Sequence, residues 1–449
     1  MTERRALLAQ ALPIMLGQAL VPLVNIVDAA LIGRSGGGAA PLAGVALGAT
    51  LVNFLFWTFG FLRMGVTGLT AQAEGAGDAA ERDRLLLRGL MLGAALGLML
   101  IVAAPLLAWL GLWLLGAGPG VAAPAGHFVR ARLLGAPAAL ALYAVSGWLL
   151  GLGRSRDALH VQLLLNGLNI VFDLALVRLF HAGVRGIGLG TSAAEWCALL
   201  LGLRLALRAL GGAGRLRARI DRAALFAPAA LRRLCAVQAE ILVRTLALLA
   251  LFGWFAHVGA RRGAVALAAN HVLLQMVSIS AFMLDGIAFT AEARVGQAIG
   301  AGARATLRRA IRLCAECSAL GGLGFALAIA LAGSRFVALV TPDPAVRAAA
   351  AAALPGAALV PALGWPSWLL DGIFLGAARG RALRNAALVA LGAYLVTDGL
   401  ARPWGNGGAW VALLASYVYR ALALGVALPG LMAAVGASPR DAAKDQVRR

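Results

Sequence analysis

Long apolar segments recur along the whole chain of 449 residues, and they constrain its fold more than any other feature. Hydrophobic residues make up 61% of the sequence and charged residues 13%, against averages of about 45–50% and about 25% in soluble domains. Most segments reach the roughly 20 residues that an α-helix needs to cross a bilayer. Because every backbone group in lipid must be hydrogen-bonded within the protein, such segments can cross only as helices. The sequence therefore predicts an all-α integral membrane protein that crosses the membrane many times.

The apolar runs, and the glycine, proline and arginine residues between them, predict twelve transmembrane helices. The longest arginine-rich connection, 211–233, leaves six helices on either side. We therefore predict an N-terminal six-helix lobe over residues 1–212 and a C-terminal six-helix lobe over residues 213–449. The predicted spans are 6–33, 41–74, 81–116, 121–152, 156–181, 187–210, 230–258, 264–299, 303–333, 344–378, 382–400 and 408–435.

The two halves of the sequence echo each other. The segment L-T-A-Q-A at 69–73 resembles F-T-A-E-A at 289–293, and G-A-G at 75–77 recurs at 300–302. Six helices per half insert both halves with the same orientation, which is a parallel repeat about a pseudo-twofold axis along the membrane normal. Two such lobes around a central cleft are typical of transporters that work by alternating access.

The basic residues, which give the chain a formal net charge of +21, indicate its orientation. Alternate loops hold most of them, including 204–233, 304–312 and 379–384, whereas the opposite loops, to which we assign Arg130 and Arg132, hold fewer. By the positive-inside rule, the arginine-rich loops and both termini face the cytoplasm, in a multi-pass protein of the cell inner membrane. Anionic membrane lipids, and not nucleic acid, are the expected partners of this charge.

Asp28 lies in the middle of the first apolar segment. A carboxylate at mid-bilayer costs at least about 2.5–3.5 kcal/mol, so it persists mainly where function requires it. Pro22 lies six residues earlier and weakens the helix, because proline removes one intrahelical hydrogen bond. A titratable group beside a weak point can bend a helix according to its charge. We therefore predict that Asp28 couples transport to an ion and that Pro22 permits the bending.

A second group of polar residues lies in the fifth and sixth predicted spans. Asp173 follows Asn169 by four residues, which stacks the amide and the carboxylate on one helix face. With Asp28, these side chains form an oxygen-rich pocket for a proton or a small hard cation such as Na⁺, to which Thr191 adds a hydroxyl. Two neighbouring buried carboxylates share a proton and titrate as a pair. The predicted proton- or cation-coupling residues are Asp28, Asn169, Asp173 and Thr191.

The C-terminal half carries further intramembrane carboxylates, which either bind ions or are structural. Glu240 and Arg244 have the i, i+4 spacing of an ion pair on one helix. Asp285 and Asp371 are each followed by glycine within a long predicted helix. Two acids nearer the ends of spans, Glu195 and Glu292, are expected to be solvated or ion-paired.

Several classes of activity leave no trace in the sequence. There is no P-loop, nucleophile elbow or Ser/His/Asp arrangement, and the five histidines lack metal-ligand spacing. The C-x-x-C spacing of Cys314 and Cys317 has no second pair or nearby histidine, which favours a structural role. We expect no cofactor, no resident metal and no enzymatic activity, so an ion gradient must supply the energy for transport.

Several ordered motifs resemble the multidrug and toxic compound extrusion (MATE) family, in its DinF-like branch, over essentially the whole chain. They are V-D-A-A-L-I-G (27–33), F-G-F-L-R-M-G-V-T-G-L-T-A-Q-A-E-G-A-G-D (59–78), L-N-I-V-F-D (168–173), I-L-V-R-T-L (241–246), F-M-L-D-G-I-A-F-T-A-E-A-R-V-G-Q-A-I-G-A-G (282–302) and L-L-D-G-I-F-L-G-A (369–377). The resemblance implies twelve helices in two lobes and export of organic compounds in exchange for H⁺ or Na⁺. It implies a coupling role for Asp28 and a cation site with Asn169, Asp173 and Thr191. The family's C-lobe carboxylates correspond most nearly to Glu240, Asp285 and Asp371.

The sequence is best interpreted as a monomeric, proton-coupled antiporter that exports amphipathic, often cationic, small organic molecules. Two alternatives are a sodium-coupled exporter of the same family and a flippase for lipid-linked precursors. A flippase is disfavoured because the deep charges are mainly acidic, whereas a pyrophosphate substrate needs a cationic cleft. A channel is disfavoured by the two-bundle repeat, and a membrane enzyme by the lack of clustered catalytic residues.

Overall fold

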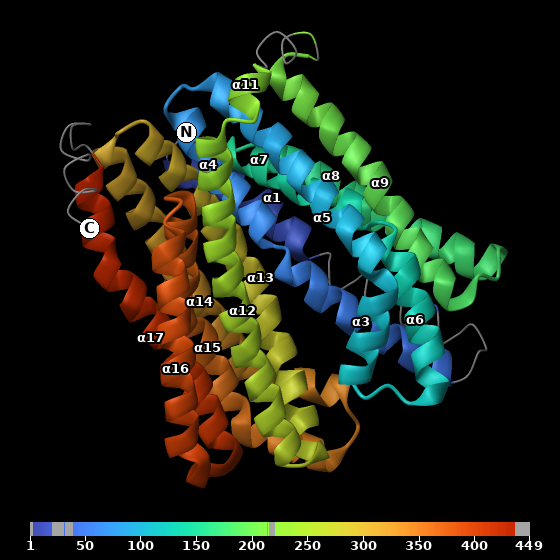
Figure 1. Cartoon of the computed structure of the whole chain (residues 1–449). Coiled ribbons are helices and arrows are strands. Elements are labelled where there is room, and N and C mark those ends of the chain that lie inside the picture. The colour runs from blue at the N-terminus through green and yellow to red at the C-terminus, as the bar shows by residue number, and fades with distance from the viewer. Residues whose placement is uncertain (1–2, 20–30, 32–38, 213, 215–220, 436–449) are drawn as a thin grey trace. The chain divides into compact units, whose positions relative to one another are not determined.

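The computed structural model describes residues 3–19, 31, 39–212, 214 and 221–435. Pro22 and Asp28, two of the predicted functional residues, lie outside the described residues. Every regular element of the described part is a helix, which agrees with the predicted all-α class (Figure 1).

The helices follow the predicted spans closely, although several spans consist of two helices. The first half contains α1 (Glu3–Ala19), α3 (Ala39–Thr58), α4 (Phe61–Gly75), α5 (Ala79–Leu114), α6 (Pro119–Leu133), α7 (Ala136–Gly151), α8 (Ser155–Leu174), the π-helix η1 (Ala175–Leu179) and α9 (Gly183–Leu210). The second half contains α11 (Arg222–Leu225), α12 (Pro228–Arg261), α13 (Ala264–Gly300), α14 (Arg304–Val340), α15 (Pro344–Gly376), α16 (Gly380–Ala401), the 3₁₀-helix η2 (Arg402–Trp404) and α17 (Gly405–Ala434).

Eight helical stretches of the described residues are long and apolar enough to cross a membrane, or nine if one bent pair is counted as a span. The bent pair is α6 and α7, which meet at 50° within the predicted span 121–152. Pro137, in the first turn of α7, lacks the N–H that a continuous helix would need. One of the eight stretches, Gly380–Ala434, is 55 residues long. A straight helix of that length would span about 80 Å, but η2 divides the stretch into α16 and α17, which match two predicted spans.

The chain divides into two compact units. One unit, here the N-terminal unit, comprises Leu16–Thr70 and Asp78–Cys235, and the other, the C-terminal unit, comprises Met1–Met15, Ala71–Gly77 and Ala236–Arg449. The C-terminal unit thus includes the beginning of the chain and the end of α4. The lobe boundary at residues 212 and 213 stays a prediction.

Within the N-terminal unit, α5 packs on α7, α8 on α9, and α6 on both α3 and α9. The helix α7 is buried almost along its entire length. Its Trp148 is fully buried, and the indole N–H donates a hydrogen bond of 2.9 Å to the carbonyl oxygen of Arg82 on α5. The polar edge of a large apolar side chain is thereby satisfied inside the bundle.

Within the C-terminal unit, α13 packs on α14 and α15, and α16 on α17. Phe255 of α12 meets Trp410 of α17 edge-on, with ring centroids 5.3 Å apart. Next to this apolar contact, the buried amide of Asn270 exchanges hydrogen bonds of 2.8 Å with Asn406 and accepts one of 2.9 Å from the Trp410 indole. These buried polar groups are therefore paired across helices.

Gly75 of α4 and Gly300 of α13 lie where the two helix ends approach each other with their backbones nearly in contact. A Cβ atom on Gly75 would lie 2.0 Å from the carbonyl oxygen of Gln297, and a Cβ atom on Gly300 would lie 2.0 Å from that of Gln72. Each glutamine precedes its own glycine by three residues, so the two contacts are reciprocal. The segments 75–77 and 300–302, which are similar in sequence, therefore occupy equivalent places in this contact.

Candidate functional site

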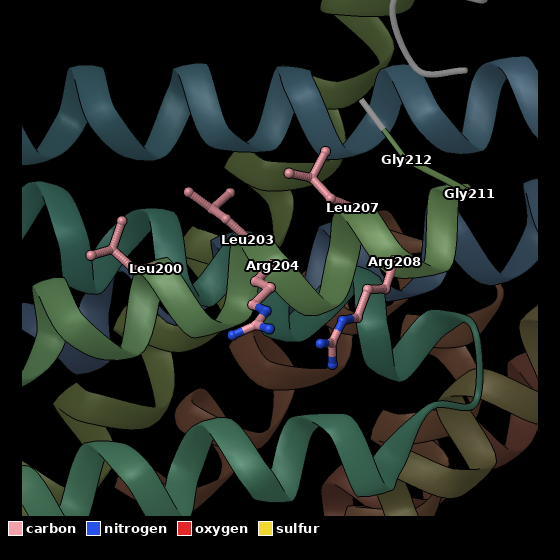
Figure 2. Close-up of a pocket in the computed structure, with 7 residues that line it drawn as sticks. All are labelled: Leu200, Leu203, Arg204, Leu207, Arg208, Gly211 and Gly212. Carbon is pink, nitrogen blue, oxygen red and sulfur yellow. The ribbon is translucent and has the colours of Figure 1, made fainter. Parts of the chain in front are cut away.

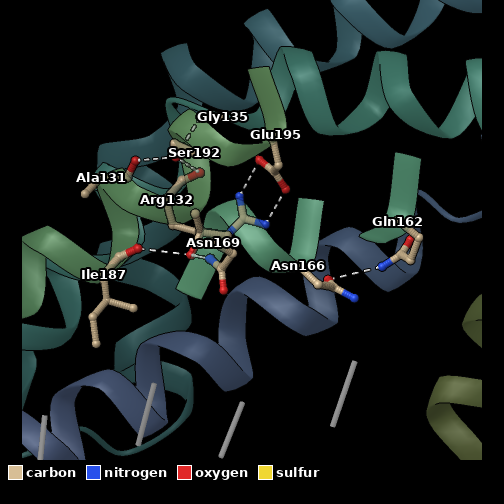
Figure 3. Close-up of polar contacts among 10 residues, drawn as sticks. Ala131, Arg132, Gly135, Gln162, Asn166, Asn169, Ile187, Ser192 and Glu195 are labelled. Carbon is tan, nitrogen blue, oxygen red and sulfur yellow. Dashed lines mark hydrogen bonds and ion pairs between the residues drawn. The ribbon is translucent and has the colours of Figure 1, made fainter. Parts of the chain in front are cut away.

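A polar stripe follows one face of α8 in the N-terminal unit (Figure 3). Gln162, Asn166, Asn169 and Asp173 are spaced by four, three and four residues, which places them on one side of a helix. The Gln162 amide donates to the Asn166 oxygen over 3.3 Å. Asn169 and Asp173 are buried, whereas a stripe facing lipid would consist of apolar side chains. The stripe is therefore built to face protein.

Thr191 of α9 is hydrogen-bonded to this polar stripe through Asn169. The Asn169 Nδ2 group donates a hydrogen bond of 2.6 Å to the Thr191 hydroxyl, which in turn donates one of 3.0 Å to the carbonyl oxygen of Ile187. Neither of these two hydrogen bonds involves the Asn169 carbonyl oxygen. That oxygen is buried and accepts no hydrogen bond from the described residues. It is thus available as an acceptor for a protonated acid or as an oxygen ligand for a small cation.

Asp173 is fully buried beside Gly190 of α9. A Cβ atom on Gly190 would lie 2.0 Å from Asp173 Oδ1 and 2.9 Å from the Asp173 backbone nitrogen. Because Gly190 precedes Thr191, the structure brings the predicted residues Asn169, Asp173 and Thr191 into one small region between α8 and α9. The π-helix η1 begins two residues after Asp173, and π-helical turns are frequent at functional sites.

The close approach at Gly190 gives a first prediction. The Gly190→Ala substitution should strongly reduce transport, because its methyl group requires Asp173 and the backbone of α8 to move. Overpacking of this kind costs about 1–3 kcal/mol, which exceeds the roughly 1 kcal/mol that alanine gains over glycine inside a helix. The measurement is drug efflux per transporter molecule in cells with equal amounts of membrane-inserted protein.

The matched control is Gly167→Ala on α8, between Asn166 and Asn169. A Cβ atom on Gly167 would have no neighbour within 4 Å. This variant should transport like the unaltered chain and be equally or more stable. Equal efflux by the Gly190→Ala variant would show that the close fit at Asp173 is not needed.

An ion pair lies one turn further along α9. Arg132 of α6 donates to both carboxylate oxygens of Glu195, over 2.7 and 2.5 Å (Figure 3). The Arg132 guanidinium also lies 4.7 Å from the centre of the Phe56 ring. The assignment of Arg132 to an outer loop is wrong, because it lies in the last turn of α6 with a largely buried side chain. Glu195 is buried and ion-paired, one of the two environments expected for it. The pair neutralises both charges beside the Asn169–Thr191 region.

Backbone contacts hold the end of α6 against α9 at this pair. The Ser192 hydroxyl lies within hydrogen-bond distance of the carbonyl oxygens of Ala131 and Arg132, 2.9 and 3.0 Å away, and it accepts a bond of 3.1 Å from the Gly135 N–H. At the break between α6 and α7, the Gly135 N–H also bonds to the Arg132 carbonyl oxygen over 3.3 Å, and Ser192 links both groups to α9. The overlooked sequence signal is that Arg132 falls inside the predicted span 121–152, where a charge needs a partner.

In the C-terminal unit, Asp371 of α15 lies between two arginines. Arg244 of α12 forms a hydrogen-bonded ion pair with it, and the Arg420 guanidinium of α17 lies 3.8 Å from the same oxygen. Arg420 also donates a bond of 2.9 Å to the hydroxyl of Ser367, one turn before Asp371. Arg420 lies 5.6 Å from the centre of the Tyr417 ring. Three helices thus meet at a buried cluster of charged groups.

The other predicted C-lobe carboxylates have separate positions. Glu240 of α12 forms an ion pair of 3.2 Å with Arg381 and lies against Gly380 at the start of α16. Asp285 is half-buried on α13. Glu240 and Arg244 therefore do not pair with each other as their spacing suggested. Glu240 pairs with Arg381, and Arg244 pairs with Asp371, both on other helices.

The sequence-based prediction missed two buried carboxylates of the described residues, Asp83 of α5 and Asp398 of α16. Asp398 of α16 is buried and accepts a hydrogen bond of 3.1 Å from the indole N–H of Trp254. It lies inside the predicted span 382–400, so the cost of an acid in lipid would have identified it. No cluster of three or more potential metal-ligating His, Cys, Asp or Glu side chains occurs among the residues that the structure describes.

A family model described as MatE matches residues 13–175 and 240–398. The chain is 36% identical over 424 residues to the DNA damage-inducible protein F of Escherichia coli K12, covering 94% of this chain and 91% of that protein. It is 31% identical over 340 residues to a probable multidrug resistance protein NorM of Pseudomonas putida, covering 74% and 70%.

A solved structure of a multidrug resistance MATE family transporter of the MOP superfamily, in an outward-facing conformation, has the same fold. The TM-score is 0.87 at 19% sequence identity, and the match covers 97% of each chain. This likeness confirms the predicted fold class, an all-α membrane protein with twelve helices in two lobes. Both matched segments of the family model include parts of the polar regions described above, the first Asn169 and Asp173 and the second Asp371.

Proposed function

Because the chain belongs to the MatE family of membrane transporters, we propose that it is a secondary active multidrug antiporter, which exports amphipathic or cationic organic compounds in exchange for H⁺. The observation that carries the coupling proposal is the Asn169–Thr191 hydrogen bond beside the buried Asp173. It supplies an open amide oxygen and a carboxylate next to each other in the N-terminal unit. Asp28 completes the set as a prediction from the sequence.

In the proposed cycle, the acids of the N-terminal unit take up a proton from the outside and release substrate outward. Release of the proton toward the cytoplasm then resets the transporter. We assign the change of charge to Asp173, which is buried between α8 and α9. Arg132 and Glu195 form an ion pair nearby and neutralise each other.

The proton gradient supplies enough energy for this exchange. One proton carries about 1.4 kcal/mol per pH unit and about 2.3 kcal/mol per 100 mV of membrane potential. The sum, about 3.7 kcal/mol, supports a substrate gradient of a few hundredfold. Exchange of one proton for one monovalent cation would be electroneutral and would lose the contribution of the membrane potential.

The alternative coupling ion is Na⁺, for which an amide oxygen, a hydroxyl and carboxylates are suitable ligands. The proposal of a lipid-linked-precursor flippase has less support, because the buried arginines Arg132 and Arg244 are paired with acids and do not form a free cationic surface. The proposed location is the inner membrane, with both termini in the cytoplasm and the protein acting as a monomer.

Reconstituted vesicles test the function and the ion separately. Purified protein in liposomes loaded with ethidium, an amphipathic cation, should release the dye at least several-fold faster when a pH gradient is imposed than without one. A sodium gradient at constant pH should have no effect. Acceleration by sodium alone would replace H⁺ with Na⁺ as the coupling ion, and no acceleration by either ion would contradict the antiport mechanism.

A further inference from the structure

Arg204 and Arg208 lie one turn apart on an open groove at the C-terminal end of α9 (Figure 2). Both side chains are exposed, and Figure 2 shows their guanidinium groups extended on the same side of the helix. The groove has a volume of about 570 Å³, and its remaining lining is apolar or backbone. The lining residues are Leu200, Leu203, Arg204, Leu207, Arg208, Gly211 and Gly212.

No acidic side chain neighbours these two arginines within the groove, whereas several other exposed arginines of the described chain are ion-paired. Arg154 pairs with Asp157, Arg312 with Glu316, and Arg381 with Glu240. No acidic side chain lines the groove among the described residues. Like charges four residues apart on a helix repel each other, so an anion between them would relieve that repulsion.

The position of the groove along α9 matches the headgroup level of a bilayer. Arg185, near the start of α9, and Arg204 are 19 residues apart, which corresponds to about 29 Å of helix, close to the thickness of the hydrocarbon core. Arg208 lies one turn further out. Between the two levels, α9 exposes Trp196 and Leu200, which are 46% and 68% exposed and precede Arg204 by eight and four residues. The helix is thus apolar at the depth of acyl chains and cationic at the depth of phosphate groups.

We propose that this groove binds an anionic phospholipid. The phosphate would lie between the guanidinium groups of Arg204 and Arg208, which donate hydrogen bonds to its oxygens. The acyl chains would lie along Leu200, Leu207 and Trp196, where a water-soluble anion would gain nothing. A net negative lipid is preferred over a zwitterionic one, because the groove holds two positive charges and no compensating acid. The proposal does not depend on the transported compound or on the coupling ion.

Native mass spectrometry of the purified full chain tests this site. The protein is mixed with equal amounts of phosphatidylglycerol and phosphatidylcholine, and the ratio of the two lipids retained is measured. We expect the Arg204→Gln/Arg208→Gln variant to lower the phosphatidylglycerol preference about tenfold. The matched control, Arg154→Gln/Arg312→Gln, removes two exposed arginines that have acidic partners and should leave the preference unchanged.

Two further measurements distinguish a lipid site from a general positive surface and from a site for free anions. The Arg204→Lys/Arg208→Lys variant keeps both charges and should keep most of the preference, while an excess of inorganic phosphate should not displace the lipid. An unchanged lipid ratio in the double glutamine variant would overturn the proposal. An equal loss in the control variant would also overturn it, since any exposed arginine would then serve, and so would displacement of the lipid by inorganic phosphate.

Discussion

The Asp28→Asn variant is expected to abolish the drug resistance that the unaltered chain confers on a sensitised host, with an unchanged amount of protein in the membrane. Asparagine has nearly the same size but cannot exchange a proton, so it removes only the proposed coupling step. Asp28 lies outside the described residues, and its role follows from its position in the first predicted span. Wild-type resistance in this variant would remove Asp28 from the mechanism.

Asp173→Asn is the companion variant within the described structure. It keeps the fit against Gly190 and the stripe on α8 but removes the titratable group, so resistance should again be lost while the protein remains folded. Asp157→Asn is the matched control on the same helix. Asp157 forms a partly exposed ion pair of 2.7 Å with Arg154, and such pairs contribute about 0–1 kcal/mol. Resistance should therefore persist in the control.

Asp371→Asn is expected to have the largest effect on stability. The substitution removes the negative charge that lies between Arg244 and Arg420, leaving two largely buried guanidinium groups without their carboxylate. Breaking one side of a buried ion pair costs about 3–5 kcal/mol, because a charge is then left uncompensated in a medium of low polarity. The melting temperature of the detergent-purified protein should fall markedly, as measured by fluorescence or by size-exclusion after heating.

The control for Asp371 is Asp343→Asn at the start of the same helix. Asp343 is the N-cap of α15 and accepts hydrogen bonds from the N–H groups of Ala345 and Val346. Asparagine caps helices about as well as aspartate, so the melting temperature should change little. If Asp371→Asn instead keeps the melting temperature and loses transport, Asp371 has a functional role in ion binding and not the structural role that its two arginines indicate.

The sequence determined the helical spans because lipid leaves little choice. An apolar run of about 20 residues must form a helix there, and the predicted span 264–299 differs from α13 by a single residue at its C-terminal end. Local spacing was equally informative on α8, where Asn169 and Asp173 had to share a face whatever the rest of the chain does. The sequence similarity between the two halves also has a structural counterpart. Glycine is needed where two helix backbones touch, and the equivalent positions Gly75 and Gly300 lie at such a contact.

The partners of the charged residues were decided only by the tertiary structure. Glu240 and Arg244 have the spacing of a local pair, yet their described partners are Arg381 and Asp371, more than 100 residues away. The pairing of Arg132 with Glu195 depends on where α6 ends and on how it packs against α9, which only the tertiary structure shows. In a membrane, each helix is specified by its own composition. The face that it turns to a neighbour depends on the close fit of small residues such as Gly190, which has no local signature in the sequence.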